Sequence, residues 1–351
     1  MIIRRRSNSI QIGKVVVGGD APIVVQSMTK TDTRNIEATV TQIKELADCG
    51  CELVRIAVPD MQAAKALSTI KKNVSLPIIA DIHFNYRLAL AAIESGSDCI
   101  RLNPGNINDL NQITSVVKAA KERQTPIRIG LNAGSLPVTN KKHTSIAEHM
   151  VDIALEQIKL YESLDFNLIK VSLKAFDVLT TIQAYKEIAD KTRYPLHLGI
   201  TEAGLPKAGA IRSAVGIGIL LNEGIGDTIR VSLSTHPREE VYAAYEILKC
   251  LALREHGPTL ISCPGCGRSE TDIIELANSV NNELKQIKKS IRIAVMGCVV
   301  NGPGEARDAD IGIACGKHRA AIFKKGVVVS KVIGEANFLP ALMTEIKSLC
   351  K

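Results

Sequence analysis

Three cysteines and one glutamate near the end of the 351-residue chain have the side chains and the spacing of a metal site. Cys263 and Cys266 form a C-x2-C pair, and after 31 intervening residues Cys298 and Glu305 form a C-x6-E pair. Glycine and proline surround both pairs, so the backbone can turn sharply and bring its N–H groups towards sulfur. Three thiolates and one weaker carboxylate ligand can bind a soft metal centre.

The spacing alone leaves the identity of the metal open. Zinc and iron–sulfur clusters both use thiolates. Zinc sites often recruit histidine or a second C-x2-C pair, and the sequence has neither between Cys263 and Glu305. The ferredoxin run C-x2-C-x2-C is missing as well. A four-iron cluster with one reactive iron is the favoured interpretation, and a structural zinc knuckle or plain buried cysteines are the alternatives.

The remaining six of the nine cysteines are not expected to be ligands. Five of them lie beside apolar residues or at element ends and are predicted to be small buried side chains, namely Cys49, Cys51, Cys99, Cys250 and Cys350. Cys315 lies nearer the metal stretch, so its exclusion is weaker. An odd number of cysteines does not fit a secreted disulfide framework. With no signal peptide and no apolar run long enough to span a bilayer, we expect a cytoplasmic protein that does not contact a membrane.

The composition favours an anionic partner but argues against nucleic acid. The net charge is +8, while aromatic residues make up 3% of the chain and tryptophan is absent, which leaves few platforms for base stacking. Arg4, Arg5 and Arg6 form the one dense basic run and are expected to be a solvated N-terminal face. A nucleic-acid-binding protein with a structural zinc stays an alternative, although cations concentrated at strand ends do not fit it.

The first two thirds of the chain repeat one pattern eight times: a short β-branched run, a polar loop and an amphipathic helix. The predicted strands cover residues 23–27, 53–58, 77–82, 99–103, 127–131, 168–173, 196–200 and 228–233. Eight such units predict a TIM (β/α)8 barrel. A doubly wound open sheet is the alternative, but the residues after the first strand are no glycine fingerprint. Residues 1–20 alternate and predict a hairpin that plugs the bottom of the barrel.

A linker at His256-Gly257-Pro258 divides the predicted domains into 1–256, a diphosphate-binding barrel, and 257–351, a small α/β domain with the metal stretch. Within the second domain we expect a helix near 269–289, strands at 291–296 and 311–314, a hairpin around 323–332 and a last helix at 339–349.

The chemistry of a TIM barrel lies at the carboxyl ends of its strands. The predicted strand ends carry Arg55; Asp81 and His83; Arg101 and Asn103; Arg128 and Asn132; Lys170, Ser172 and Lys174; His197, Thr201 and Glu202; and Arg230, Ser232 and Ser234. About six cations in one ring repel each other unless an anion joins them, and arginine presents a planar fork to phosphate oxygens.

Only Asp81 and Glu202 are evident as carboxylate partners for these cations, which predicts a site for a diphosphate or a larger polyanion. The structural alternative is that each arginine pairs with a carboxylate inside the barrel. Glu202 is the candidate proton donor or acceptor. A metal-free aldolase or isomerase acting on a phosphosugar through Lys170 or Lys174 is a second enzyme hypothesis, and it leaves the three cysteines unexplained.

Seven stretches of the sequence resemble one family over essentially the whole chain. They are VQSMT at 25–29, RIAVP at 55–59, ADIHF at 80–84, RLNPGN at 101–106, GITEAG at 199–204, CPGCGR at 263–268 and CVVNGPGE at 298–305. By these motifs the chain resembles the bacterial 4-hydroxy-3-methylbut-2-enyl diphosphate synthases of the non-mevalonate isoprenoid pathway. The sequence has no long insert between the barrel and the domain with the cysteine motifs, and in this it resembles the two-domain form of that family.

The resemblance implies a [4Fe-4S] cluster held by Cys263, Cys266, Cys298 and Glu305, with the carboxylate as the exchangeable ligand. It implies the two-electron reductive ring opening of 2-C-methyl-D-erythritol 2,4-cyclodiphosphate, with loss of water, using flavodoxin or ferredoxin as electron donor. The catalytic residues would be Glu202 and Glu305. The substrate would contact Arg55, Asp81, His83, Arg101, Asn103, Arg128, Asn132, Lys170, Ser172, His197, Arg230 and Ser232.

The direction of the eighth helix predicts a homodimer. A helix that runs antiparallel to its strand ends at the bottom of the barrel, away from the mouth. Because the linker at residues 256–258 is short, the cluster domain of one chain is expected to cap the barrel of another, in a head-to-tail pair.

Overall fold

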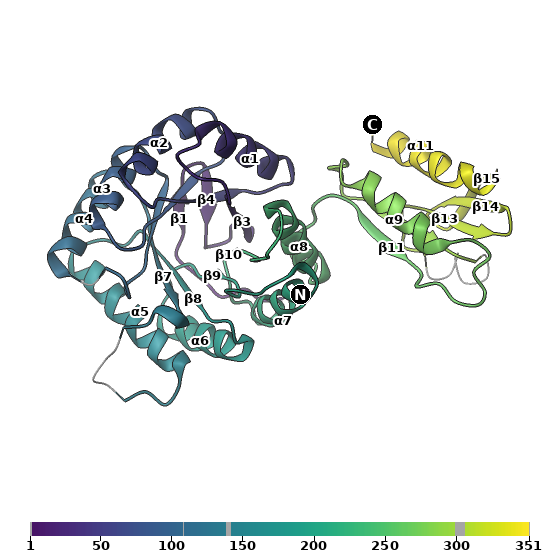
Figure 1. Ribbon diagram of the computed structural model, residues 1–351. Helices are drawn as coiled ribbons and strands as arrows, with labels where there is room; N and C mark the ends of the chain where they lie inside the picture. The colour runs from purple at the N-terminus through teal and green to yellow at the C-terminus, as the bar shows by residue number, and fades with distance from the viewer. Residues whose placement is uncertain (1, 108, 138–141, 299–305, 351) are drawn as a thin grey trace. The chain divides into compact units, whose positions relative to one another are not determined.

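The computed structural model describes residues 2–107, 109–137, 142–298 and 306–350. The chain divides into two compact units, Met1–Arg254 and Glu255–Lys351, and each is described by itself (Figure 1).

The first unit is an eight-stranded parallel barrel. Its strands are β3 (Val24–Met28), β4 (Leu53–Ala57), β5 (Ile78–Asp81), β6 (Cys99–Leu102), β7 (Ile127–Asn132), β8 (Ile169–Lys174), β9 (His197–Leu198) and β10 (Thr228–Ile229). They are hydrogen-bonded in the order β8-β7-β6-β5-β4-β3-β10-β9. A parallel bridge between Val171 of β8 and Leu196, the residue before β9, connects the two ends of this order. The predicted TIM barrel is confirmed and the open-sheet alternative is wrong. The last two strands are much shorter than predicted.

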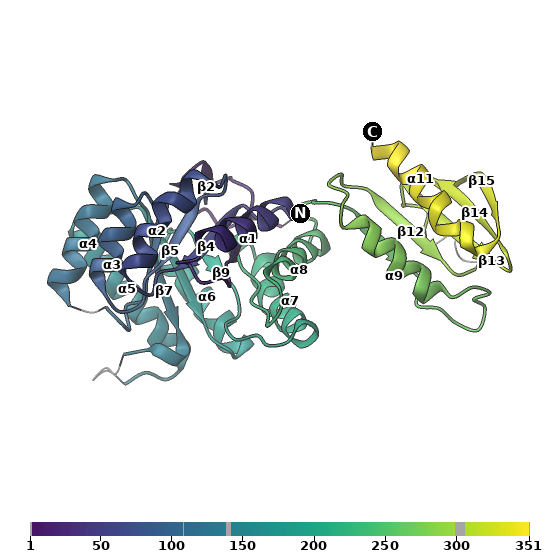
Figure 2. The same cartoon turned by 45° about the horizontal axis from the view of Figure 1, so that its top comes forward.

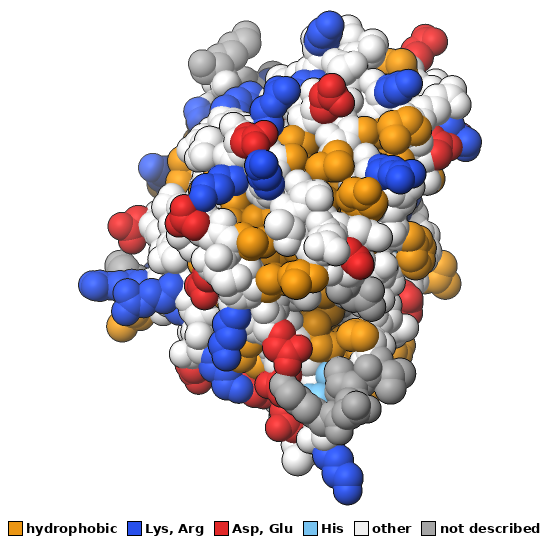
Figure 3. Space-filling model, turned by 90° about the vertical axis from the view of Figure 1, so that its left-hand side faces the viewer, with side chains coloured by type: hydrophobic (Ala, Val, Ile, Leu, Met, Phe, Trp, Pro, Cys, Tyr) orange, Lys and Arg blue, Asp and Glu red, His pale blue; other side chains and the backbone are white. Residues whose placement is uncertain are grey.

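An outer ring of helices surrounds the strands (Figure 1). The helices are α1 (Ile36–Asp48), α2 (Met61–Lys72), α3 (Tyr86–Glu94), α4 (Leu110–Glu122), α5 (Ile146–Ser163), α6 (Val178–Lys191), α7 (Pro206–Asn222) and α8 (Pro237–Cys250), with a 3-10 turn η1 (Ala133–Ser135). Most begin at a side-chain cap; for example, Asp60 accepts a hydrogen bond from the backbone N–H of Ala63. The face in Figure 3 shows charged side chains of both signs interspersed with apolar ones.

The exposure of Cys250 corrects one prediction. Helix α8 buries Val241, Ala244, Tyr245 and Leu248 against the barrel, a spacing of three or four residues. Cys250 lies two positions beyond Leu248 and therefore falls on the opposite face, where it is exposed. The prediction that Cys250 is buried was wrong.

Alternation along the strands separates the two sides of the barrel wall. Residues such as Val25, Val54, Ile100 and Val171 pack outwards with the helices in the main core. The residues between them point into the barrel, and those at its lower end are apolar. Val24, Leu53, Ile79 and Cys99 form a separate small core with Ile10, Ile12 and Val17 of the hairpin β1 (Ile10–Ile12) and β2 (Val15–Val17). The hairpin thus closes the N-terminal end of the barrel.

Arg4, Arg5 and Arg6 precede the hairpin and were expected to form a solvated face. Arg6 is exposed, but the expectation was wrong for Arg4 and Arg5, which are half-buried. Arg4 pairs with the buried carboxylate of Asp227 at 3.4 Å, and Arg5 donates to the carbonyl of Tyr194 at 2.7 Å. Both side chains therefore attach the N-terminal segment to the barrel.

The second unit is a five-stranded mixed sheet with helices. Its strands are β11 (Thr259–Ser262), β12 (Arg292–Met296), β13 (Ile311–Gly316), β14 (Arg319–Lys324) and β15 (Val327–Ile333), in that order; β11 to β13 are parallel and the other pairs are antiparallel. Helices α9 (Ile273–Leu284) and α11 (Phe338–Cys350) pack together against the sheet, and η2 (Glu335–Asn337) precedes α11 (Figure 2). Strand β11 was not predicted, because it has only four residues and is partly exposed. No helix among the described residues has both the length and the apolar character needed to cross a membrane.

Candidate active site in the barrel mouth and the cysteine loops

Four neighbouring strands bring charged side chains to one level of the barrel interior. In the parallel register Asp81 lies beside Arg101, Arg101 beside Arg128, and Arg128 beside Lys170. Partners in register point to the same side of a sheet, so all four side chains enter the barrel. Each is at least 97% buried. The upper interior is therefore charged, in contrast to the apolar lower end.

Asp81 is the carboxylate at the centre of this group. Its oxygens lie 3.2 Å from Arg101 Nη1, 3.2 Å from His83 Nε2 and 3.8 Å from Arg55 Nε. Burial by itself would raise the pKa of Asp81, but Arg55, the hydrogen bond from His83 and Arg101 together hold that pKa well below its usual range. Asp81 is thus an ionised anchor that orients two arginines.

Arg128 and Lys170 have no carboxylate partner in the described part of the chain. Arg128 Nη1 donates to Ser172 Oγ at 3.0 Å, whereas its Nε and Nη2 and the Nζ of Lys170 make no hydrogen bond with any described residue. Burial lowers the pKa of Lys170 to about 8. Buried donors of this kind destabilise the protein unless an acceptor reaches them, which is what an anion would provide.

A second buried pair lies on the neighbouring strands β8 and β9. Lys174 Nζ is 3.2 Å from His197 Nε2, and His197 Nδ1 is 2.7 Å from Thr228 Oγ1. Burial lowers the pKa of His197 well below its usual value, and the charge of Lys174 lowers it further. A neutral His197 can accept a hydrogen bond from Lys174 and leave the other lysine donors for the barrel interior.

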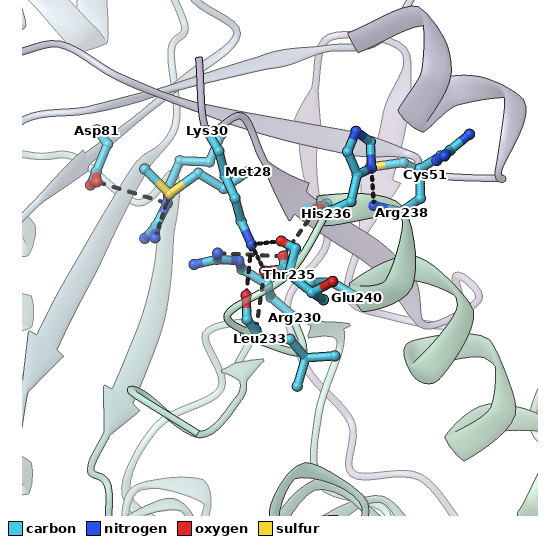
Figure 4. Close-up of polar contacts among 12 residues, drawn as sticks. Met28, Lys30, Cys51, Asp81, Arg230, Leu233, Thr235, His236, Arg238 and Glu240 are labelled. Atoms are coloured by element: carbon cyan, nitrogen blue, oxygen red, sulfur yellow. Dashed lines mark hydrogen bonds and ion pairs between the residues drawn. The ribbon is translucent and has the colours of Figure 1, made fainter. Parts of the chain in front are cut away.

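The carboxylate of Glu240, in the first turn of α8, was not among the predicted site residues. Its side chain is 1% exposed and points towards Arg230, Lys30 and the backbone of Leu233 (Figure 4). The expectation that only Asp81 and Glu202 balance the cations was therefore wrong. The signal that could have found Glu240 is an acidic residue on the apolar, barrel-facing side of α8, next to Val241 and Ala244.

Glu202 lies in a different environment from Asp81 and Glu240. It follows β9 on an exposed turn, with a φ of 54°, in the left-handed region. Within the residues that the structure describes, no hydrogen bond or ion pair restrains its carboxylate.

Two other residues that were predicted to contact the substrate make hydrogen bonds within and between the loops that follow the strands. Asn103 Nδ2 donates to Ser135 Oγ at 3.0 Å, and Asn103 Oδ1 accepts from the N–H of Gly105, so Asn103 joins the loops after β6 and β7. The carbonyl of Asn132 accepts from Ser135 Oγ. Ser232 is half-buried on the segment after β10.

Two glycines make room for the buried cations. A Cβ on Gly130 would lie 2.4 Å from Arg101 Nε, and a Cβ on Gly199 would lie 2.6 Å from Lys174 Nζ. Both distances are too short for any side chain to be added without moving the cation. The barrel interior is thus shaped around these two side chains.

In the second unit, adjacent parallel strands bring two of the predicted cysteine ligands to one edge of the sheet. Cys263 follows β11 directly and Cys298 follows β12 by two residues, and the register pairs Ser262 with Val295. The N–H of Gly297 donates to Cys263 Sγ at 3.2 Å, and a Cβ on Gly297 would lie 3.3 Å from that sulfur. A backbone donor towards the sulfur and a close approach of the Gly297 backbone to it fit a thiolate ligand.

The remaining predicted ligands are described only in part. Cys266 is exposed on a tight loop, where the N–H of Ser269 donates to its carbonyl at 2.8 Å. Glu305 lies outside the described residues. Among residues 2–107, 109–137, 142–298 and 306–350, no three histidine, cysteine or acidic side chains are grouped closely enough to hold a metal ion. Cys315 is buried in the core of this unit, and burial raises the pKa of its thiol to about 12.

Two solved structures match a part of the chain about as long as the barrel unit. Dihydropteroate synthase from Xanthomonas albilineans matches with a TM-score of 0.53 at 16% identity and covers 70% of this chain and 98% of its own. A type I 3-dehydroquinate dehydratase from Clostridium difficile matches with a TM-score of 0.52 at 14% identity, with the same coverage. At this level of identity the likeness concerns the fold.

Sequence relatives and family models cover both units. A protein from Dehalococcoides mccartyi named 4-hydroxy-3-methylbut-2-en-1-yl diphosphate synthase (flavodoxin) is 60% identical over 99% of this chain and 100% of its own. A protein of the same name from Maridesulfovibrio salexigens is 53% identical over 100% of this chain and 99% of its own. The model of the GcpE TIM-barrel domain matches residues 7–245, and that of the GcpE protein C-terminal domain matches residues 259–348. The predicted resemblance is confirmed, and the chain belongs to the GcpE family.

Proposed function

We propose that the protein catalyses the reductive ring opening of 2-C-methyl-D-erythritol 2,4-cyclodiphosphate to 4-hydroxy-3-methylbut-2-enyl diphosphate. The reaction consumes two electrons and two protons and releases one water. It is the reaction of the family to which the chain belongs, and the relatives that match its full length carry the name of the corresponding synthase.

The observation that carries the proposal is the excess of buried cations in the barrel. Arg101 and Arg55 share Asp81, while Arg128 and Lys170 have no carboxylate within the described chain and keep unpaired donors. A diphosphate carries enough charge and enough acceptor oxygens to satisfy these donors, whereas a single phosphate does not need so many. This electrostatic match favours a diphosphate substrate over a neutral sugar.

The substrate site comprises the residues that line this interior and its rim. The proposed contacts are Arg55, Asp81, His83, Arg101, Asn103, Arg128, Asn132, Lys170, Ser172, His197, Arg230 and Ser232. Among these, the arginines and Lys170 bind phosphate oxygens, and Asp81 keeps Arg55 and Arg101 aimed at them. Because both phosphates stay bound while the ring opens, the reacting carbon and oxygen atoms keep their orientation in the site.

Cys263, Cys266, Cys298 and Glu305 would hold a [4Fe-4S] cluster. The edge that brings Cys263 and Cys298 together, with a backbone donor on the Cys263 sulfur, supports this assignment. When bound, the cluster supplies the electrons and a Lewis-acidic iron whose carboxylate ligand can be exchanged. Glu202 donates the proton that lets the substrate oxygen leave as water; its exposed turn at the mouth leaves the carboxylate unrestrained by described residues.

A head-to-tail homodimer would bring the two sites together. Arg254, the last residue of the first unit, donates to the carbonyl of Ile23 and to Glu52, which both precede barrel strands. The first unit therefore ends at the closed end of the barrel. The four residues 255–258 reach at most about 14 Å, so we infer that the cysteine unit of a second chain covers the mouth. A monomer with full specific activity at high dilution would contradict this inference.

Flavodoxin is the proposed electron donor, because the relatives carry that word in their names. The cytoplasmic location stays a prediction that rests on the cysteine count.

The decisive experiment is turnover of the cyclic diphosphate by protein purified without oxygen, with reduced flavodoxin as donor. A brown protein with about four irons and four sulfides per chain that forms the allylic diphosphate is expected. A colourless zinc protein that anaerobic reconstitution cannot convert would contradict the cluster. Schiff-base turnover of a phosphosugar without metal would favour the aldolase alternative instead.

A further inference from the structure

Glu240 connects three separate segments at the point where the first and last barrel strands meet. Its Oε1 lies 3.2 Å from Lys30 Nζ and accepts from the N–H of Leu233 at 3.1 Å. Its Oε2 accepts from Ser27 Oγ at 3.2 Å and from Arg230 Nη2 at 3.4 Å. The donors come from β3, from the loop after β3 and from the segment after β10.

Three hydrogen bonds and one ion pair engage this carboxylate. A carboxylate has about four lone-pair positions, two on each oxygen. Three hydrogen-bond donors and the ammonium of Lys30 lie against the two oxygens of Glu240, so protein groups engage both oxygens. Its role is therefore to hold other groups in place.

The two cations that Glu240 contacts differ in how many donors remain. Lys30 Nζ donates to the carbonyl of Leu233 at 2.6 Å and to that of Thr235, so backbone carbonyls use two of its three N–H groups while its charge faces Glu240. Arg230 gives only Nη2 to Glu240, and its buried Nε bonds to no described residue. Arg230 is thus the member that still has donors for an anion, and Lys30 fixes the carboxylate that aims it.

The strand does not orient Arg230 by itself. Strand β10 ends at Ile229, and Arg230 follows it directly. The backbone N–H of Arg230 continues the ladder by donating to the carbonyl of Leu198 at 3.0 Å, but this bond does not fix the side chain. The direction of its side chain therefore depends on Glu240.

We propose that Glu240 is a positioning residue for the diphosphate: it holds one edge of the Arg230 guanidinium so that the other edge faces the substrate. The inference rests on the proposed function, because Arg230 is one of the proposed diphosphate contacts. It adds a residue of the α8 helix to the site, and it explains why a buried glutamate lies on the apolar side of that helix.

Two substitutions at Glu240 test separately the negative charge of its side chain and the length of that side chain. Glu240→Gln replaces one acceptor oxygen by a donor that faces other donors, and it removes the counter-charge of Arg230. Glu240→Asp keeps the charge but shortens the side chain by one methylene, so it withdraws the carboxylate from Arg230. Glu239→Gln is the matched control, since Glu239 is exposed in the same helical turn.

The test measures the binding of inorganic pyrophosphate to the anaerobically purified holoprotein by calorimetry. Loss of one charged hydrogen bond weakens binding by about 10- to 100-fold, so both Glu240 variants are expected to bind that much more weakly, and Glu239→Gln like the parent protein. With the cyclic diphosphate, KM should rise by a similar factor while kcat changes little. Wild-type affinity for pyrophosphate in both Glu240 variants would overturn the proposal.

A double variant distinguishes positioning from general destabilisation. If Glu240 acts through Arg230, then Glu240→Gln has no further effect on pyrophosphate affinity once Arg230→Met is present. A full additional loss in the double variant would overturn the positioning role. Failure of the parent protein to bind pyrophosphate would instead contradict the proposed diphosphate site itself.

Discussion

The barrel interior and the cysteine edge of the second unit are held in different ways. In the barrel, side chains from β4, β5 and β6 contact each other. Arg101, which is almost entirely buried, binds both Asp81 and the carbonyl of Gly130 on β7. In the second unit, Cys263 is half-buried and directly follows β11. Cys266 is exposed and lies on the loop after that strand.

The difference shows how each site obtains its precise shape. Burying cations is energetically unfavourable, and Asp81 and Glu240 offset part of that penalty within the wall of strands, so the proposed anion site would be formed before an anion binds. The cysteine side chains leave the ends of two strands, and a bound metal centre would itself draw them together. We therefore expect substitutions in the barrel to change ligand affinity and substitutions at the cysteine edge to change metal content.

The largest effect is expected for Cys298→Ser. Serine is a poor ligand for a soft metal. Losing a residue that only supports a metal ligand lowers activity by up to roughly 100-fold, so losing a ligand itself should lower turnover by more than that. Visible absorbance and iron content should fall with it, while pyrophosphate affinity stays unchanged. The control is Cys250→Ser on the exposed face of α8. A Cys298→Ser protein with normal colour and turnover would contradict the assignment of Cys298 as a metal ligand.

Arg128→Met tests the opposite region. Removing this buried cation should weaken pyrophosphate binding by about 10- to 100-fold, the equivalent of one hydrogen bond to a charged group. Because burial and the neighbours Arg55 and Arg101 already lower the pKa of Arg128 well below its usual value, the folded state without ligand should gain stability. Thermal unfolding and calorimetry check both effects. Unchanged binding together with a lower Tm would favour a purely structural arginine.

Glycine substitutions compare the two regions directly. Gly130→Ala forces Arg101 to move and should cost about 1–3 kcal/mol of stability, with a loss of pyrophosphate affinity. Gly297→Ala meets Ser269 Oγ at 2.8 Å, a small side chain that can rotate, so a lesser loss that is limited to iron retention is expected. Gly134→Ala and Gly267→Ala are the controls, because a Cβ at either position has no neighbour within 4 Å among described atoms. Equal effects at Gly130 and Gly134 would contradict the tight packing around Arg101.

The smallest effect concerns pH. Burial lowers the pKa of Lys170 to about 8, below that of a lysine in the unfolded chain. Between that value and the unfolded pKa of about 10.4, the unfolded state binds more protons, so stability should rise with pH by at most about 1.4 kcal/mol per pH unit.

Urea unfolding of the protein and of Lys170→Met between pH 8 and 10 measures the contribution of Lys170. The rise should disappear in Lys170→Met and persist in Lys159→Met, whose lysine is exposed. Pyrophosphate affinity should fall over the same range, because Lys170 loses its charge. A pH dependence that is identical in all three proteins would rule out this role of Lys170.

Sequence patterns predicted the framework of both sites. The alternation in segments such as Ile127–Asn132 placed Arg128 on one side of a strand and Ile127 and Ile129 on the other, and the structure has this arrangement. Strand β11 escaped prediction, since four partly exposed residues carry too weak a pattern. The C-x2-C and C-x6-E spacings could be recognised without any structure, because the predicted ligands of each pair lie within a few residues of each other.

The sequence by itself determined the barrel, the hairpin, the cysteine motifs and which strands carry cations at their carboxyl ends, since each of these follows from local periodicity and spacing. Only the tertiary structure decided that Glu240 balances Arg230 and contacts Ser27, 213 residues away. It likewise decided that Arg4 binds Asp227. The physical reason is that the partner of a buried charge is set by how distant segments pack, and no local pattern records which of many carboxylates will lie within reach.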